Sequence, residues 1–320
     1  MKKEETFQIL EEYLKGIPVY NTHSHHLPAE QLTDVGLDYL LAHSYLNEEW
    51  EDCGVPGKED FYRRFRDRSF YLWISRALTE IYGIPDPLSP ENWEKTDQAV
   101  RAAYQDPSHH TRILEQNCGY QHVIVDAYWN PGEKRTDSPV FERTYRINQF
   151  LYGYNLTAAD HNGNNPYQNY GWKFFGDFDR YVEQVQRKME EAAESGCVAF
   201  KCASAYDRGL DFEAASKEDA QKAFASADPT EQDIFHFQNY IFQEICRICA
   251  GLDIPLQVHT GLGKMQKSNC RYLTEAIRRN PHTKFVLFHG SYPWLDDLCG
   301  LAFSFRNVYV DLCWLPIIST

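Results

Sequence analysis

Long apolar runs are absent from this sequence. No stretch approaches the roughly twenty consecutive apolar residues that a membrane-spanning helix requires. The N-terminal stretch MKKEETFQILEEYLKG also lacks the uninterrupted apolar segment of a signal peptide, since acidic residues follow the basic ones on an amphipathic pattern. We therefore predict an N-terminal surface helix and a cytoplasmic protein without a membrane partner.

An excess of basic residues is absent too. The chain has 32 lysines and arginines against 46 aspartates and glutamates, and its formal net charge is −14. Such a charge disfavours partners that are rich in phosphate. We expect no nucleic acid and no anionic membrane as partners, but a small-molecule substrate. A homo-oligomer stays open, because barrels with exposed helices often associate.

A disulfide framework is not indicated either. The nine cysteines are scattered and odd in number, which is typical of reduced thiols in the cytosol. Cys246 and Cys249 form a C-x-x-C, but they lie in a helical pattern without a second such pair. We predict that they are two small apolar side chains on one helix face.

Seven apolar stretches have the length of β-strands, and helical patterns separate most of them. The predicted strands are residues 17–23, 122–128, 150–156, 197–202, 255–260, 285–290 and 308–314, of which 150–156 has the weakest pattern. Nearly continuous apolar strands that alternate with helices indicate parallel strands covered on both faces. No glycine-rich phosphate turn follows the first strand, so the pattern favours a TIM-type (β/α) barrel of the α/β class over a doubly wound sheet.

Residues 36–116 differ from the rest of the chain. They contain helical patterns rich in charged and aromatic residues and no convincing strand. We interpret this segment as a helical insertion after strand one that caps the mouth of a distorted barrel. The whole chain, residues 1–320, would then be a single barrel domain.

Polar residues that can bind a metal stand where the predicted strands end. They are His23, His25, Lys201, His259 and His289. Chemistry in a TIM barrel sits at the carboxyl ends of the strands. Side chains alternate along a strand, so His23 and His25 point the same way. Several imidazoles on one face match a divalent metal such as zinc.

Other polar and aromatic residues near the strand ends are candidates for substrate contacts. Arg208, with its planar fork, could clamp a carboxylate, or it could form a surface pair with Asp207. Tyr206 and Trp129 could line the pocket, although aromatic side chains in such places often serve packing. His26 is out of phase with the His-x-His pair, and we place it at the rim.

The segments NTHSHH, VAFKCASAYDRG, PLQVHTGLG, KFVLFHGSYP and NVYVDLCW together resemble the amidohydrolase superfamily. The resemblance is to its amidohydrolase-related (amidohydrolase 2) family and, more distantly, to uronate isomerases. It spans residues 17–314 apart from the insertion. It implies one or two divalent ions, zinc first and manganese as the other choice.

The resemblance leaves two ligand sets open. In the first, His23, His25 and a carboxylated Lys201 hold one ion, while His259 and His289 hold a second that the carbamate bridges. In the second, His23, His25 and His259 hold a single zinc ion, and His289 contacts substrate or water. Lys201 and His289 are the predicted catalytic residues.

The resemblance also leaves one expected residue unmatched. The superfamily has an eighth strand that ends in an aspartate, whereas this sequence stops at LCWLPIIST, just after the seventh strand. We therefore expect the eighth strand and its aspartate to be missing from this chain. Asp311 is a weak substitute and Asp126 has the same ambiguity, because both are predicted to lie inside strands.

The predicted function is metal-dependent hydrolysis. A metal-bound hydroxide would cleave a C–N or C–O bond, as in an amide, lactone or ester, of a small carboxylate-bearing substrate. The same ligands could serve a non-oxidative decarboxylase or a uronate isomerase-like enzyme, because one fold supports several chemistries. Without the final aspartate, a catalytically silent metal-binding barrel is the third alternative.

Overall fold

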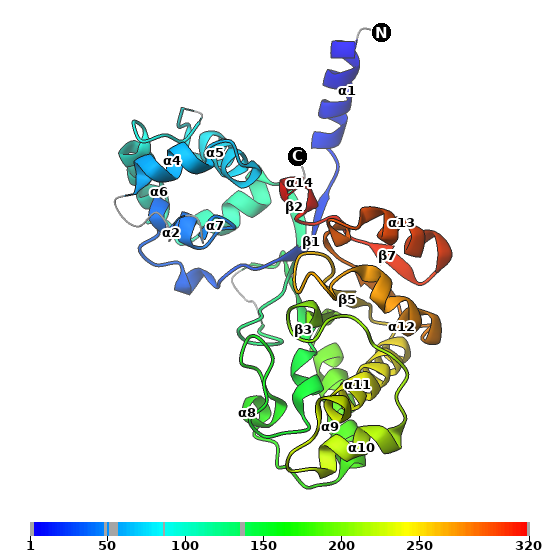
Figure 1. Cartoon of the computed structure of the whole chain (residues 1–320). Coiled ribbons are helices and arrows are strands. Elements are labelled where there is room, and N and C mark those ends of the chain that lie inside the picture. Colours follow the sequence, from blue (N-terminus) through cyan, green and yellow to red (C-terminus); the bar gives the residue numbers. More distant parts are fainter. Residues whose placement is uncertain (1–2, 48–49, 51–56, 86, 135–137, 319–320) are drawn as a thin grey trace.

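A computed structural model of the chain describes residues 3–47, 50, 57–85, 87–134 and 138–318 (Figure 1). Its centre is a curled sheet of seven parallel strands that pair in chain order, β1 to β7. The strands are β1 (Val19–Ser24), β2 (Tyr120–Val125), β3 (Phe141–Arg146), β4 (Cys197–Cys202), β5 (Leu256–Val258), β6 (Phe285–Leu287) and β7 (Val308–Val310). The prediction of an α/β fold of the TIM-barrel type is confirmed, and the described residues contain no eighth strand.

Helices and short helical turns connect the strands from β3 onward. They are η3 (Asn148–Tyr152), α8 (Pro166–Tyr170), α9 (Phe178–Glu194), η4 (Ser204–Tyr206), α10 (Lys217–Ala225), α11 (Glu231–Leu252), η5 (Cys270–Leu273), α12 (Thr274–Arg279), η6 (His289–Ser291), α13 (Leu295–Ser304) and α14 (Leu315–Ile318). The longest, α11, begins with a capping box in which Thr230 and Asp233 satisfy each other's backbone N–H groups. It ends at Asp253, whose backbone is left-handed.

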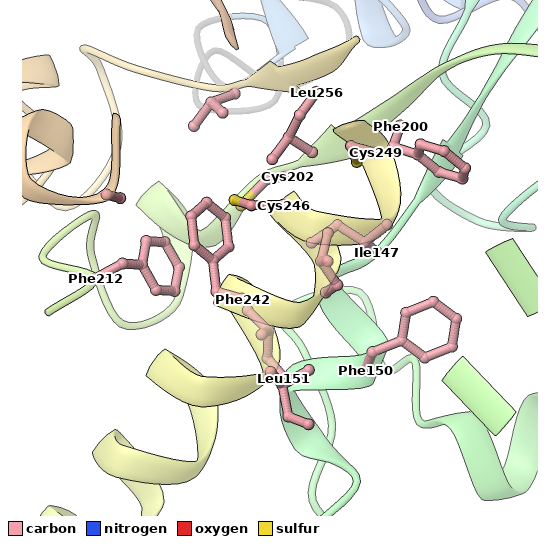
Figure 2. Close-up of a cluster of buried hydrophobic side chains, with 14 of the residues drawn as sticks. Ile147, Phe150, Leu151, Phe200, Cys202, Phe212, Phe242, Cys246, Cys249 and Leu256 are labelled. Atoms are coloured by element: carbon pink, nitrogen blue, oxygen red, sulfur yellow. The ribbon is translucent and has the colours of Figure 1, made fainter. Parts of the chain in front are cut away.

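The main hydrophobic core lies between the sheet and these helices. Figure 2 shows Phe200 and Cys202 of β4 beside Phe242 and Cys246 of α11. Side chains alternate across a strand, so packing Phe200 and Cys202 outward turns Lys201 to the opposite, inner side. Cys246 and Cys249 are buried free thiols in this core, as predicted.

The segment between β1 and β2 forms a second helical region. It contains η1 (Ala29–Gln31), α2 (Leu37–Ala42), α4 (Lys58–Phe65), α5 (Ser69–Tyr82), α6 (Trp93–Ala103), α7 (His109–Arg112) and the π-helical turn η2 (Ile113–Asn117). Trp50, Phe61, Tyr71 and Trp93 are buried in a hydrophobic cluster of its own. In Figure 1 this region stands to one side of the sheet, apart from α9 to α11.

Helix α1 (Lys3–Lys15) projects from the body at the N-terminus (Figure 1). Phe7 and Tyr13 on this helix are exposed, in keeping with the predicted surface helix. In the described part of the chain, no helix combines the length and the apolar character needed to cross a membrane.

The predicted third strand is wrong. Residues 150–156 begin inside the buried turn η3, and β3 lies earlier, at Phe141–Arg146. The sequence FERTYR was overlooked because it carries charges, but these charges are compensated inside the protein. Arg146 pairs with Asp126, and Arg143 donates hydrogen bonds to the Gly132 carbonyl, at 2.6 Å, and to Ser195. Buried charges of this kind require a partner, which no local pattern reveals.

Four strands, β2, β5, β6 and β7, also end earlier than predicted, and two of these ends change the interpretation of an aspartate. β2 ends at Val125 and β7 at Val310, so Asp126 and Asp311 are the first residues after their strands. The interpretation of both as residues inside strands is therefore wrong. Both carboxylates lie at the sheet end that carries the histidines.

Candidate metal centre

The carboxyl ends of the strands bring the predicted ligands together. His23 lies in β1, and His25 and His259 directly follow β1 and β5. Ring centroids are 4.6 Å apart for His23 and His25, 5.7 Å for His23 and His289, and 4.5 Å for His259 and His289. Four imidazoles from three strand ends therefore form one group.

Backbone carbonyls hold three of these imidazoles. His25 Nδ1 is 2.7 Å from the Asp126 carbonyl, His259 Nε2 is 2.7 Å from the Leu262 carbonyl, and His289 Nδ1 is 3.0 Å from the Cys313 carbonyl. A carbonyl oxygen only accepts hydrogen bonds, so each of these ring nitrogens carries the hydrogen. In a neutral ring the other nitrogen then presents a lone pair, which is how metal-binding histidines are usually oriented.

The lone pairs of His259 and His289 face each other. His259 Nδ1 and His289 Nε2 are 3.0 Å apart, and each is the nitrogen that the carbonyl contact leaves without a hydrogen. Burial lowers the pKa of His259 well below its usual value, and burial next to Lys201 lowers the pKa of His289 to about 3. Both rings are therefore neutral near pH 7. Two facing lone pairs repel each other unless a cation lies between or beside them.

His23 provides a further donor. Its Nδ1 is buried and has no hydrogen-bond partner in the described part of the protein. Burial, and then the charge of Lys201, lower the pKa of His23 well below its usual value. Ligand atoms of His23, His25 and Asp126 lie within 4.8 Å of one another. This side of the group can also hold a cation.

Lys201 points into the same space from β4. Its side chain is buried, its amine has no hydrogen-bond partner among the described residues, and Nζ lies 3.8 Å from the ring centroid of Phe288. Burial lowers the pKa of this amine to about 8. A buried lysine without a partner is costly, so its position calls for a chemical reason.

Asp126, whose carbonyl contacts His25, forms a buried ion pair with Arg146. Arg146 Nε is 2.9 Å from Asp126 Oδ1, and Arg146 Nη2 is 2.9 Å from Oδ2. Burial opposes ionisation of Asp126, but the guanidinium outweighs it and lowers the pKa of the carboxyl to about 2. This pair fixes the residue whose carbonyl orients His25. Sequence reasoning missed Arg146, because it placed the third strand elsewhere.

Asp311 closes the other end of the group. Thr22 Oγ1 donates to Asp311 Oδ2, and the Cys313 backbone N–H donates to Oδ1 at 2.7 Å. The carboxylate charge raises the pKa values of Lys201 and His289 against the larger effect of burial. A buried carboxylate therefore acts on both predicted catalytic residues.

A cavity of about 610 Å³ opens beside the imidazoles. Its wall includes His23, His25 and Trp129 from the strand ends. The helical region between β1 and β2 adds residues 42–45 and Asn47. Trp129 thus lines the cavity as predicted, with its indole N–H donated to Glu133 at 3.2 Å.

The predicted carboxylate clamp does not reach this cavity. Arg208 donates to Asn239 Oδ1 at 2.7 Å and to the Asp211 carbonyl at 3.0 Å, and its guanidinium lies over the ring of Phe235. These partners occupy the fork that a substrate carboxylate would need. Tyr206 is not among the residues of the cavity wall either. Its ring packs against that of His259, with ring centroids 4.3 Å apart.

His26 leaves the His-x-His pair, as expected from its phase along the strand. Its Nδ1 lies 3.1 Å from Nε2 of His110, on the helical region. His26 still lines the cavity, so it is a rim residue that links β1 to α7.

Backbone strain marks the same place. His289 and Trp314 have left-handed backbones, with φ of 65° and 69°. Residues with a β-carbon avoid this region unless the surroundings enforce it, and such residues gather at functional sites.

Comparisons with known proteins agree with this geometry. The amidohydrolase family model matches residues 168–318, which contain Lys201, His259 and His289. A curated uronate isomerase from Streptococcus equi subsp. zooepidemicus is 22% identical over 302 residues, which cover 82% of this chain and 62% of that protein. Together these matches support a relationship of the chain to the amidohydrolase superfamily.

The chain spans less than two thirds of the length of its curated relatives. The second is Protein fluG of Emericella nidulans, 29% identical over 139 residues, which cover 38% of this chain and 16% of that protein. The superfamily consists of enzymes and implies a divalent metal ion.

Solved structures share the fold. A protein from Lactobacillus casei assigned to the metal-dependent hydrolases has a TM-score of 0.65 at 18% identity and covers 97% of this chain and 77% of its own. Uronate isomerase from Thermotoga maritima has a TM-score of 0.68 at 17% identity, covering 92% of this chain and 76% of its own. Glucuronate isomerase from Caulobacter crescentus has a TM-score of 0.69 at 15% identity, covering 92% and 73%.

The residues of the centre fit the divalent ion that the superfamily implies. His25, His259 and His289 are neutral and have oriented lone pairs, and His23 and Lys201 have buried nitrogens without partners among the residues that the structure describes. Neutral imidazoles with outer hydrogen bonds to carbonyls are ligands that zinc accepts well.

Proposed function

We propose that this protein is a divalent-metal-dependent hydrolase that cleaves a C–N or C–O bond in a small amide, lactone or ester. The observation that carries the proposal is the pair of facing lone pairs on His259 and His289, oriented by two backbone carbonyls. The match of residues 168–318 to the amidohydrolase family supports hydrolysis as the reaction class.

The ion would be held by His23, His25, Lys201, His259 and His289. Zinc suits these nitrogen ligands, and manganese is the second choice. When bound, such an ion lowers the pKa of water towards neutrality and polarises a carbonyl. The unpartnered amine of Lys201 favours the arrangement with a carboxylated lysine, because a carbamate would turn an isolated cation into an anionic ligand.

Other residues of the chain would orient the ligands and shield them from water. The Asp126–Arg146 pair keeps His25 in place through the Asp126 carbonyl. In the arrangement with one ion, His289 Nε2 is free to hold or move a proton, since its Nδ1–H stays on the Cys313 carbonyl. Phe288 lies against Lys201 and excludes water from its amine.

Metal content and turnover test the proposal together. The full chain would be purified with zinc or manganese and analysed for metal, with and without a chelator. It would then be assayed against aryl amides, esters and lactones. Metal binding with hydrolysis that the chelator abolishes is the expected result, and a wild-type protein without bound metal contradicts it. The mass of the intact protein, or a crystal structure, would show whether Lys201 carries a carbamate.

An aldose–ketose isomerase is the second candidate. It is favoured by the match to a curated uronate isomerase over 82% of the chain and by the fold shared with two isomerases. A colorimetric assay for ketose formation from D-glucuronate separates the two candidates, because hydrolysis produces no ketose. A cytoplasmic location and a homo-oligomer stay predictions from the sequence.

A further inference from the structure

The cavity beside the imidazoles has walls with little charge and many aromatic rings. Tyr45, Tyr128, Trp129 and Trp314 all line it. Among the described lining residues there is no aspartate, glutamate, lysine or arginine. Apart from the imidazoles, its polar groups are a few hydroxyls, the indole N–H groups of Trp129 and Trp314, the thiol of Cys313 and the amide of Asn47.

The aromatic rings stand on both sides of the imidazole group. Tyr128 packs edge-on against His25, with ring centroids 5.4 Å apart. Trp314 packs edge-on against His289, with centroids 5.1 Å apart. His23 lies between these two histidines, at 4.6 Å from His25 and 5.7 Å from His289. A ligand over the imidazoles would therefore have aromatic neighbours on two sides.

Aromatic residues of the helical region between β1 and β2 hold Trp314 in place. Tyr45 stacks on Trp314 with ring centroids 5.0 Å apart and planes at 23°, and Phe70 stacks behind Tyr45 at 5.5 Å. A stack of three rings loses little side-chain freedom when a ligand binds, which favours affinity. Trp314 Nε1 is buried and has no acceptor among the described residues, so it can donate to a polar atom of a ligand.

We propose that the part of the substrate that enters this cavity is a flat, uncharged, unsaturated ring next to the bond that is cleaved. The substrate class is then an aryl or heteroaryl amide or ester, or a lactone fused to such a ring. This inference rests on the proposed function, because it places the reacting bond over the proposed metal ligands. Flat π-systems stack well on aromatic faces.

The same walls disfavour a uronate. Apart from the proposed metal ion, its carboxylate would find no cation among the described lining residues, and the aromatic part of the wall offers its hydroxyls few partners. The sequence predicts a carboxylate-bearing substrate and offers Arg208 as one candidate clamp for it, but Arg208 binds Asn239 and Asp211 instead.

Binding of two matched amides tests the inference. Benzamide and cyclohexanecarboxamide share the amide, but only benzamide has a flat ring. We expect benzamide to bind the zinc-loaded full chain about tenfold more tightly, by ligand-observed NMR titration. Trp314→Leu should abolish this preference. Trp314→Phe should retain it, which shows that the loss is not caused by misfolding. Trp73→Leu, an exposed tryptophan of α5 outside the cavity wall, is the control and should also retain it.

Equal affinity for the two amides, or tighter binding of D-glucuronate than of benzamide, would overturn the inference. An unchanged preference in Trp314→Leu would overturn it as well. Elemental analysis of the same samples separates the two proposals. Bound zinc without a ring preference contradicts only this inference, whereas wild type without bound metal contradicts the proposed function.

Discussion

The sheet with its outer helices and the helical region between β1 and β2 are built differently. The sheet buries a large core against α9 and α11, and it carries the candidate ligands on its inner side. The helical region is organised around Trp50, Phe61 and Trp93 in a separate cluster, yet it supplies residues 42–45 to the cavity wall. The sheet therefore carries the candidate ligands, while the helical region shapes the space in front of them.

The largest effect is expected at the ligands of the sheet. His23→Ala removes one donor from the imidazole group, so the purified protein should contain no metal above background and should have no turnover. Elemental analysis after purification with zinc measures the change. His282→Ala, an exposed histidine before β6 that is neither a proposed ligand nor part of the cavity wall, serves as the control and should keep its metal. Full metal content in His23→Ala would exclude His23 as a ligand.

The second-largest effect is expected at the buried ion pair of Asp126 and Arg146. Arg146→Met leaves the Asp126 carboxylate buried without its partner and should lower the free energy of unfolding by about 3–5 kcal/mol. Urea titration of the metal-free protein measures the loss. The double variant Asp126→Asn/Arg146→Met should recover most of it. Arg278→Met, which breaks an exposed pair with Glu275, should cost less than about 1 kcal/mol. Similar losses in both arginine variants would contradict this account.

The two cores can be compared directly. Phe242 of α11 and Phe61 of α4 are fully buried, one in each cluster, so Phe→Ala at either position should cost about 3–5 kcal/mol locally. Hydrogen exchange should show loss of protection in α11 for Phe242→Ala, and in α4 to α6 for Phe61→Ala. If Phe61→Ala weakens protection equally in α11, the two regions unfold as one unit and the distinction between them is wrong.

A stabilising change is expected at Lys201. The pKa of the folded-state amine, about 8, lies below the unfolded value of 10.5, so the charged amine destabilises the fold at every pH below about 8. Lys201→Met should therefore raise the unfolding free energy of the metal-free protein by about 3 kcal/mol at pH 7.

The pH dependence of the unfolding free energy tests whether the buried charge of Lys201 causes this effect. As the pH rises from about 8 to 10.5, the unfolded wild type keeps a proton that the folded form has lost. Wild type becomes relatively more stable over this range, and the advantage of Lys201→Met disappears. An advantage that does not change with pH would show that burial of charge is not its cause. Loss of activity in the same variant would assign Lys201 to function rather than to folding.

The smallest effect is expected at the start of α11. Thr230→Ala removes one half of the capping box and should cost about 1 kcal/mol. Thr230→Ser keeps the hydroxyl and should cost much less. Thermal unfolding of both variants measures the difference. Equal losses would show that the methyl group of Thr230, not its hydrogen bond, stabilises the helix end.

The sequence by itself determined the class of fold and which residues are candidate ligands. The alternation of apolar strands and helices predicts parallel strands, and the period of two along a strand places His23 and His25 on one face. His259 and His289 could be added because carboxyl ends of parallel strands meet at one end of a sheet. These conclusions depend only on local periodicity and on the order of the elements.

Only the tertiary structure decided which polar groups meet. The strand Phe141–Arg146 was not recognised, because its charges are acceptable only beside partners that are distant in the chain, such as Asp126. The sequence left Arg208 open as a carboxylate clamp or as a surface partner of Asp207, whereas the fold pairs it with Asn239 on α11. The tautomers of His259 and His289 depend on carbonyls whose positions follow from the folded loops. Hydrogen bonds and ion pairs are set by distance in space, which spacing along the sequence does not encode.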